Sequence, residues 1–359
     1  MNRRAIDTLS SDLVAARDHF SRVTGGLDGE RLFGPKLAIV NPPLWEIGHV
    51  GWFQEHWCLR WDEGNLRPSI LEGADKLYDS SNVAHDTRWD LPLPGLAATR
   101  AYLSEVLHGT LSRLAREPEN ERLRYFVRLA TLHEDMHAEA LHYTHQTLGY
   151  SDPLGIAGAG VAVGRDLSFP ASTVRLGAEQ GDERFVFDNE KWAHDVALAP
   201  FEIAPTPVTN AQFIEYVELG GQPPRYWQRV EGAWHERRFD ALRRLEPNAP
   251  LRHVDWNEAQ GYCKWSCRRL PTEAEWMRAA DELQWGEVWE WTASTFAPFA
   301  GFSADPYADY SQPWFNTHKV LKGASFATPR RLVHPQFRNF FVADRGDVFA
   351  GFRTCKINL

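Results

Sequence analysis

The first 150 residues carry apolar positions at helical spacing. Leu9, Leu13 and Ala16 recur every three or four residues, which is typical of one face of an α-helix. A second apolar stretch follows a pair of prolines, which suit the first turn of a helix. The four expected helices cover residues 6–16, 44–52, 102–114 and 123–148. Four helices of this kind predict a helical bundle.

The pattern changes after residue 149, where a glycine-rich stretch precedes short β-like runs separated by turns. The expected strands cover residues 173–176, 185–187, 196–199 and 201–203. One helix is expected over 211–217, behind an N-cap at Thr209–Asn210, and another behind the capping-box pair Thr272 and Glu275. The sequence therefore predicts an α+β protein of two domains with little regular structure in the second. We place the helical domain at 1–150, a linker at 151–172 and the second domain at 173–359.

An irregular segment of the first domain, residues 62–95, is rich in Pro, Asp and Ser. It is too long to be a simple connection between two helices, so we expect it to be functional.

The composition excludes several classes of protein. With 39 Lys and Arg against 48 Asp and Glu, the net charge is −9, and no basic tract is present, which argues against nucleic-acid binding. No apolar run is long enough for a membrane span, and charged residues interrupt the N-terminus, so we expect neither a membrane partner nor a signal peptide. The four scattered cysteines form no CxxC motif, and Cys263 and Cys267 lie in an apparent helix. These features predict reduced thiols and a cytoplasmic location.

The strongest chemical signal is the sequence His133-Glu134-Asp135-Met136-His137. Two histidines four residues apart on a helix project from one face and can bind one metal ion. The spacing is that of the zincin HExxH motif, which also needs a third ligand and a glutamate aimed at the metal-bound water. His49 is the best third ligand, and His56 is the alternative. Three imidazoles suit iron(II), zinc or copper.

Several ordered motifs give the chain a resemblance to a known family. They are Asn41-Pro-Pro-Leu-Trp-Glu-Ile-Gly-His49, the His133–His137 segment, and the segments at 187–190, 207–210, 269–276, 288–292, 338–341 and 351–353. In this order they resemble the ergothioneine-pathway sulfoxide synthases, which join a DinB-like four-helix bundle to a formylglycine-generating-enzyme-like, C-type-lectin-like domain. The resemblance implies that His49, His133 and His137 bind nonheme iron(II).

The resemblance also implies a reaction. Members of this family use iron(II) and O2 to bond a chalcogen donor to the imidazole C2 of hercynine, Nα-trimethylhistidine. A tyrosine hydroxyl supplies a proton or hydrogen atom, and Tyr307 is the first candidate for it and Tyr310 the second. Aromatic rings can hold the trimethylammonium group. Candidate rings are those of Phe340, Phe341, Trp45 and Trp52, in a chain with 15 tryptophans.

Two departures from the family pattern concern substrate binding. Met136 stands where a hercynine-binding Gln is common, and Phe340 and Phe341 follow Asn339 where enzymes that use γ-glutamylcysteine often have Trp-Asp. Arg88 is the one residue of the irregular segment that fits a carboxylate clamp. An uncharged donor therefore fits better.

The branch that the chain resembles in these positions is the selenoneine synthases, which use a 1-seleno-sugar. Four residues of the irregular segment are candidates to bind the sugar hydroxyls: Asp79, Ser80, Asn82 and His85. The alternative is ergothioneine- or ovothiol-type synthesis with cysteine or γ-glutamylcysteine. A zinc-dependent DinB-type thiol transferase fits the three histidines but does not account for the second domain. A formylglycine-generating oxidase needs two late cysteines, and only Cys355 is late here.

Overall fold

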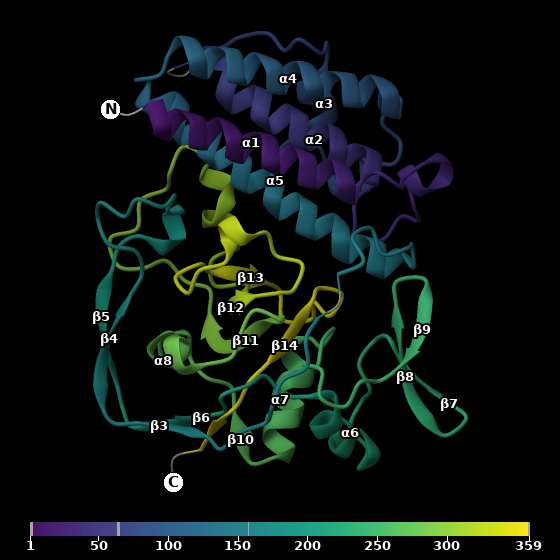
Figure 1. The fold of residues 1–359 in the computed structure, drawn as a ribbon, viewed down its shortest axis with the longest axis vertical. Coiled ribbons are helices and arrows are strands. Elements are labelled where there is room, and N and C mark those ends of the chain that lie inside the picture. Colours follow the sequence, from purple (N-terminus) through teal and green to yellow (C-terminus); the bar gives the residue numbers. More distant parts are fainter. Residues whose placement is uncertain (1–2, 63–64, 157, 358–359) are drawn as a thin grey trace. The chain divides into compact units, whose positions relative to one another are not determined.

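The computed structural model describes residues 3–62, 65–156 and 158–357. The chain divides into two compact units, Met1–Leu148 and Gly149–Leu359 (Figure 1). Each unit is described by itself below. The expected combination of a helical domain with a mixed helix-and-strand domain is confirmed.

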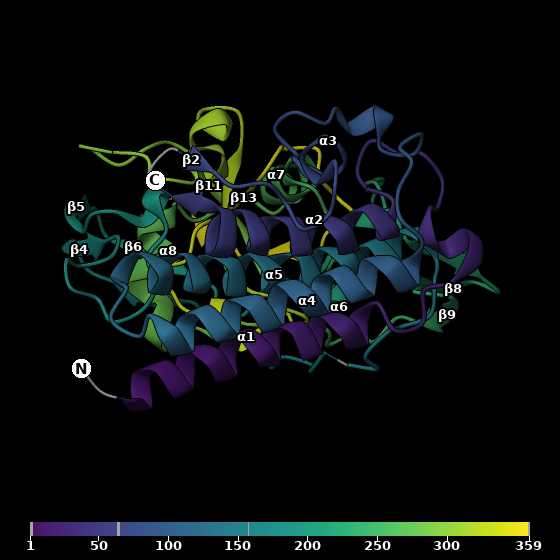
Figure 2. The same cartoon turned by 90° about the horizontal axis from the view of Figure 1, so that it is seen from above.

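Four long helices form the first unit, as predicted. They are α1 (Arg3–Val23), α2 (Pro43–Glu55), α4 (Leu96–Arg116) and α5 (Glu121–Leu148). Helix α1 packs against α5, and α2 packs against both α4 and α5 (Figure 2). All 13 residues of α2 are buried, because this helix is apolar on nearly every side and lies inside the bundle.

The segment between α2 and α4 contains short elements of its own. These are a π-helical turn (His56–Arg60), β1 (Trp61–Asp62), β2 (Asn65–Leu66), α3 (Ala74–Tyr78) and a 3-10 turn (His85–Thr87). Another 3-10 turn, Gly29–Leu32, follows α1. Helix α3 packs against α2, so the irregular segment predicted to be functional places backbone beside the helix that carries His49.

The second unit combines three short helices with short strands. The helices are α6 (Asn210–Glu218), α7 (Trp256–Trp265) and α8 (Glu273–Ala279). The first strands are β3 (Leu167–Phe169), β4 (Ser172–Leu176), β5 (His194–Leu198), β6 (Phe201–Ile203), β7 (Trp227–Val230), β8 (Ala233–Arg238) and β9 (Ala241–Arg244). The later strands are β10 (Arg268–Arg269), β11 (Val288–Thr295), β12 (Lys319–Ala324), β13 (Asn339–Phe341), β14 (Ala350–Phe352) and β15 (Cys355–Lys356). Among the described residues, 3-10 turns cover Asp188–Glu190, Ala280–Glu282, Ala308–Tyr310, Gln312–Trp314 and Arg330–Leu332.

These strands form several small sheets. One has the order β13-β12-β11-β14, with β11 antiparallel to β12 and parallel to β14 (Figure 1). A second has the order β10-β15-β6-β3, β7-β8-β9 form a third, and β4 pairs with β5. The core beneath them is aromatic: Trp276 and Trp291 are fully buried, and each donates its indole N–H to a buried oxygen. Part of the high tryptophan content is therefore packing in this unit.

Most local predictions for the second unit are correct. Strands β4 and β6 match two expected strands, and the capping box at Thr272 and Glu275 begins α8. The expected strand at 185–187 is wrong. The N–H of Phe187 donates to the Glu190 carboxylate at 2.9 Å, so a side chain takes up the donor that a neighbouring strand would have used. Strand β3 lies inside the range expected to be a linker.

The cysteines are free thiols, and three of the four are buried. Cys267 does not lie in a helix as expected: α7 ends at Trp265, and Cys267 adopts a left-handed conformation with φ of 54°. Among the described helices, none combines the length and the apolar content that a membrane crossing requires.

Candidate metal centre

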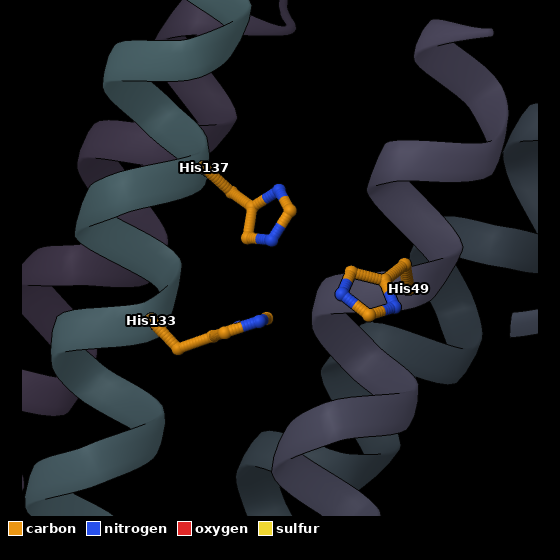
Figure 3. Close-up of side chains that lie close together, drawn as sticks. All are labelled: His49, His133 and His137. Carbon is orange, nitrogen blue, oxygen red and sulfur yellow. The ribbon is translucent and has the colours of Figure 1, made fainter. Parts of the chain in front are cut away.

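Helices α2 and α5 bring three histidines together. The potential ligand nitrogens of His49, His133 and His137 all lie within 4.8 Å of one another. Figure 3 shows His133 and His137 one above the other on α5, facing His49 on α2, with nitrogens turned into the space between the helices. The side chain of His137 is 20% exposed, whereas His49 and His133 are nearly inaccessible.

The ring of His49 is fixed by the segment that follows α2. Its Nδ1 lies 2.8 Å from the carbonyl oxygen of Tyr78, which can only accept a hydrogen bond, so Nδ1 carries the proton and Nε2 has the lone pair. Trp45 stacks on the imidazole with ring centroids 4.8 Å apart. The Trp45 indole N–H donates to the carbonyl of Leu77 at 2.7 Å. These contacts set both the tautomer and the ring plane of His49, as is typical of the groups behind a metal-binding histidine.

The ring of His137 is fixed by a carboxylate from the other helix. Its Nδ1 donates to Glu46, and the second oxygen of Glu46 accepts a hydrogen bond from Asn41 Nδ2 at 2.6 Å. Burial alone would raise the pKa of Glu46, but the nearby His137 and the hydrogen bonds from His137 and Asn41 lower it to about 2. An ionised Glu46 makes Nδ1 the protonated nitrogen and leaves Nε2 of His137 for a metal.

The ring of His133 packs against the aromatic ring of Phe53. Phe53 stacks on it with centroids 3.6 Å apart and planes nearly parallel. Burial, and then the nearby His137 and His49, lower its pKa well below the usual value. Burial and the nearby His137 similarly lower the pKa of His49 to about 3. Neutral imidazoles are the form that binds metal, so the donors present fit a divalent transition ion.

Glu134 does not serve this centre, although it follows His133 directly. It is 1% exposed, and both of its carboxylate oxygens accept hydrogen bonds from the guanidinium of Arg17. Arg17 also donates to Gln54 at 2.7 Å. A glutamate that is neutralised in this way is not available as a general base, so the HExxH spacing here does not carry zincin chemistry.

His56, the alternative third ligand, is not part of the group that could hold a metal within the described residues. It lies in the π-helical turn after α2 and packs its ring against Trp52 and Trp57.

Trp45 is 1% exposed, and its ring contacts His49 and the guanidinium of Arg88. The structure therefore gives Trp45 no open face for a substrate cation. Met136 is half-buried on α5.

Gly48 explains part of the motif that contains His49. A Cβ atom at this position would overlap with the ring of Tyr78, whose carbonyl accepts from His49. Glycine therefore lets α3 approach α2 closely enough for that hydrogen bond.

Arg88 is buried against the ring of Trp45. Its Nη1 donates to Asn41 at 2.7 Å, and its Nη2 donates to the carbonyls of Val83 at 3.1 Å and Ser80 at 3.4 Å. Its side chain thus connects the irregular segment, through Ser80 and Val83, with Asn41 just before α2.

The other candidates in the irregular segment bond mainly within it. Asp79 accepts from the backbone N–H of Ser81 at 3.0 Å and from the amide of Asn82 at 2.7 Å. His85 Nε2 lies 2.7 Å from the carbonyl of Val40. Asn82 and Ser80 are exposed, so both have solvent-facing surface.

The two candidate tyrosines lie together in the second unit. The rings of Tyr307 and Tyr310 are 6.1 Å apart, and Tyr310 stacks on Phe187 at 4.4 Å. Burial, and then the nearby Glu190, raise the pKa of Tyr310 well above its usual value, so its hydroxyl keeps its proton.

Strand β13 brings three further candidates to the same neighbourhood. Phe340 lies 5.9 Å from Tyr310 and stacks on Phe296 at 4.0 Å. Asn339 Oδ1 accepts from the backbone N–H of Phe340, and the guanidinium of Arg345 lies over the ring of Phe341.

Glu46, Asn41 and Tyr78 were not expected at this site. Glu46 and Asn41 belong to the same motif as His49, so their place in that motif could have indicated that they lie at the site. The role of the Tyr78 carbonyl has no signal in the sequence, because every residue has a carbonyl group.

Comparisons with known proteins concern the two domains and the chain as a whole. The Sulfatase-modifying factor enzyme 1-like domain matches residues 165–285 and 283–357, which together span more than half of the chain. The DinB superfamily matches residues 12–141. The chain is similar to the hercynine oxygenase of Mycolicibacterium thermoresistibile, at 29% identity over 96% of this chain and 94% of that protein.

The hercynine oxygenase of Mycobacterium tuberculosis is 28% identical over 97% of this chain and 98% of its own length. Ergothioneine biosynthesis protein 1 of Schizosaccharomyces pombe is 25% identical over 50% of this chain and 29% of its own. The chain therefore belongs to the Sulfatase-modifying factor enzyme 1-like family and, with its DinB domain, is an oxidoreductase of the ergothioneine-type sulfoxide synthase group.

Proposed function

We propose that this protein bonds a chalcogen donor to the imidazole C2 of hercynine in an iron- and O2-dependent reaction. The observation that carries the proposal is the three-histidine centre of α2 and α5, in a chain whose relatives of similar length are hercynine oxygenases. His49, His133 and His137 would hold iron(II), which supplies the activation of O2 when it is bound.

The residues around this centre perform the binding and positioning. Tyr78 and Glu46 fix the two ring tautomers, so the ligand nitrogens are oriented before any metal arrives. The partial exposure of His137 provides the approach for substrates. Tyr307, or else Tyr310, remains our candidate to deliver a proton or hydrogen atom during the reaction.

We further propose a 1-seleno-sugar as the donor. A thiol with free carboxylates requires cationic clamps, and the Arg88 guanidinium already donates to Asn41, Val83 and Ser80. Uncharged Phe340 and Phe341 follow Asn339 in β13, where they offer no carboxylate for a charged donor. The remaining candidates for contact with hercynine or the donor are Met136, Asp79, Ser80, Asn82, His85 and Asn339.

The second candidate is a sulfur donor, cysteine or γ-glutamylcysteine. It is favoured by the names of the relatives, which include an ergothioneine biosynthesis protein. The two candidates share hercynine and differ in the atom transferred, so a direct competition separates them.

The test loads the protein with Fe(II) without oxygen and then adds O2, hercynine and one donor at a time. The donors are the seleno-sugar, γ-glutamylcysteine and cysteine, and the product is identified by its mass. We expect a product whose mass shows that it contains both hercynine and the selenium of the seleno-sugar. The His137→Ala variant should form no such product. A clear preference for a thiol would support the second candidate, and no product with any donor would contradict both.

Metal analysis provides an independent check. Iron near one per chain in the active protein is expected. Zinc as the only active metal would contradict the oxidative reaction and favour a thiol transferase.

A further inference from the structure

Two separate routes lead from the histidine centre to one buried arginine. The first is a series of hydrogen bonds that starts at His137. His137 donates to Glu46, Glu46 accepts from Asn41 Nδ2 at 2.6 Å, and Asn41 Oδ1 accepts from Arg88 Nη1 at 2.7 Å. Glu46 accepts from both sides, whereas Asn41 donates through its amide nitrogen to Glu46 and accepts through its amide oxygen from Arg88.

The second route is a stack of rings that starts at His49. Trp45 lies on the His49 imidazole with planes 9° apart, and the guanidinium carbon of Arg88 lies 3.9 Å from the Trp45 ring centroid. A planar guanidinium packs well on an indole face, which a lysine ammonium does not match. Arg88 therefore contacts Trp45, which stacks on His49, and Asn41, which bonds to the Glu46 partner of His137.

Arg88 itself is held firmly. It is 8% exposed, and it donates to the carbonyl of Val83 through both Nε and Nη2. A side chain with its donors committed inside the protein is a poor clamp for a mobile substrate carboxylate. The same commitments make it a rigid support for its neighbours.

We propose that Arg88 is a positioning residue for the metal centre, acting on His137 through Asn41 and Glu46 and on His49 through Trp45. The proposal rests on the proposed function in that it assumes a metal held by these histidines. It assigns Arg88 to the ligands instead of to the donor substrate, for which the sequence had suggested it.

The test measures Co(II) binding, because Co(II) reports both affinity and ligand geometry through its visible absorption. Arg88→Met should weaken binding about 10- to 100-fold and change the shape of the cobalt bands, since partners behind a ligand typically contribute this much to metal affinity. A role confined to stability would alter the unfolding curve and leave the bands of the folded protein as they were.

Arg122→Met is the matched control. Arg122 also lies 3.9 Å from a tryptophan centroid, that of Trp61, but it donates hydrogen bonds to the Trp61 carbonyl and the Asp62 carboxylate. It should bind Co(II) with the affinity and spectrum of the unaltered protein.

Asn41→Asp tests the first route alone and keeps the size of the side chain. An aspartate can still accept from Arg88, but it cannot donate to Glu46, so Co(II) binding should weaken about tenfold. This variant keeps the proposal testable if Arg88→Met does not fold. In the double variant, the loss should be smaller than the product of the two single losses, because both act through the same hydrogen bond.

Unchanged affinity and unchanged cobalt bands in Arg88→Met would overturn the proposal, and so would fully multiplicative losses in the double variant. Neither outcome affects the proposed reaction, which is tested by product formation. Failure of the unaltered protein to bind Co(II) at all would overturn both.

Discussion

Helices α2 and α5 both contribute histidines to the candidate metal centre, but the rings of these histidines are fixed by different means. His49 on α2 depends on residues from the segment after it, namely the Tyr78 carbonyl, together with the Trp45 ring of its own helix. The histidines of α5 depend on α2, since Phe53 packs on His133 and Glu46 accepts from His137. Helix α2 therefore orients the histidines of both helices, whereas α5 places its two histidines on one face and depends on α2 to fix their rings.

The two glutamates near the ligands show the same contrast. Glu134 is next to His133 in the chain, yet it pairs with Arg17 away from the centre. Glu46 is 91 residues from His137 in the chain, yet it fixes that ring. Proximity in sequence did not decide which carboxylate contacts a candidate ligand, because a helix turns neighbouring side chains about 100° apart.

The largest effect should follow from removing a ligand. His137→Ala should abolish both metal binding and turnover, because two imidazoles cannot replace the three-point site. His56→Ala should retain both. Iron content and product mass would check this pair, and an inactive, metal-free His56→Ala protein would contradict the ligand set.

The next effect concerns stability. Glu134→Ala leaves the guanidinium of Arg17 buried without its carboxylate, so the free energy of unfolding should fall by about 3–5 kcal/mol. The folded fraction should still bind metal with affinity within a few-fold of the unaltered protein. Denaturant unfolding and Co(II) titration measure the two quantities, and a selective loss of metal binding would place Glu134 at the centre after all.

Gly48→Ala tests the close approach of α3 to α2. The added Cβ overlaps with the Tyr78 ring, and overpacking of this kind should destabilise the protein by about 1–3 kcal/mol. At Gly109 of α4, the nearest atom to a new Cβ is a methyl carbon of Leu59 at 3.1 Å, which can move. Gly109→Ala should therefore be neutral or slightly stabilising, because alanine favours helices. Thermal unfolding of both variants measures the two changes in stability. Equal losses of stability would contradict a specific close approach of α3 to α2 at Gly48.

The smallest effect should follow from Glu46→Gln. The amide oxygen can still accept from His137, but the negative charge and the second acceptor, for Asn41, are lost, so Co(II) affinity should fall by about tenfold. The free energy of unfolding of the metal-free protein should change little by comparison with Glu134→Ala. Affinity at the level of the unaltered protein would show that orientation alone, without charge, is sufficient.

Local rules predicted much of the fold. Apolar spacing located the four long helices, and the capping box at Thr272 and Glu275 located the start of α8. The same rules failed at residues 185–187, where a short apolar run favoured a strand but the Glu190 side chain takes the Phe187 N–H. Periodicity describes which face is apolar and cannot foresee a backbone donor paired with a side chain.

The sequence by itself determined the helical bundle, the two histidines on one face of α5 and the family motifs that contain His49. Only the tertiary structure decided that Glu46 bonds to His137 while Glu134 pairs with Arg17, and that Arg88 lies on Trp45. Helical spacing is a property of neighbouring residues and can be read along the chain. Hydrogen bonds and ring stacks across the bundle join residues tens of positions apart, so they exist only once the helices have packed.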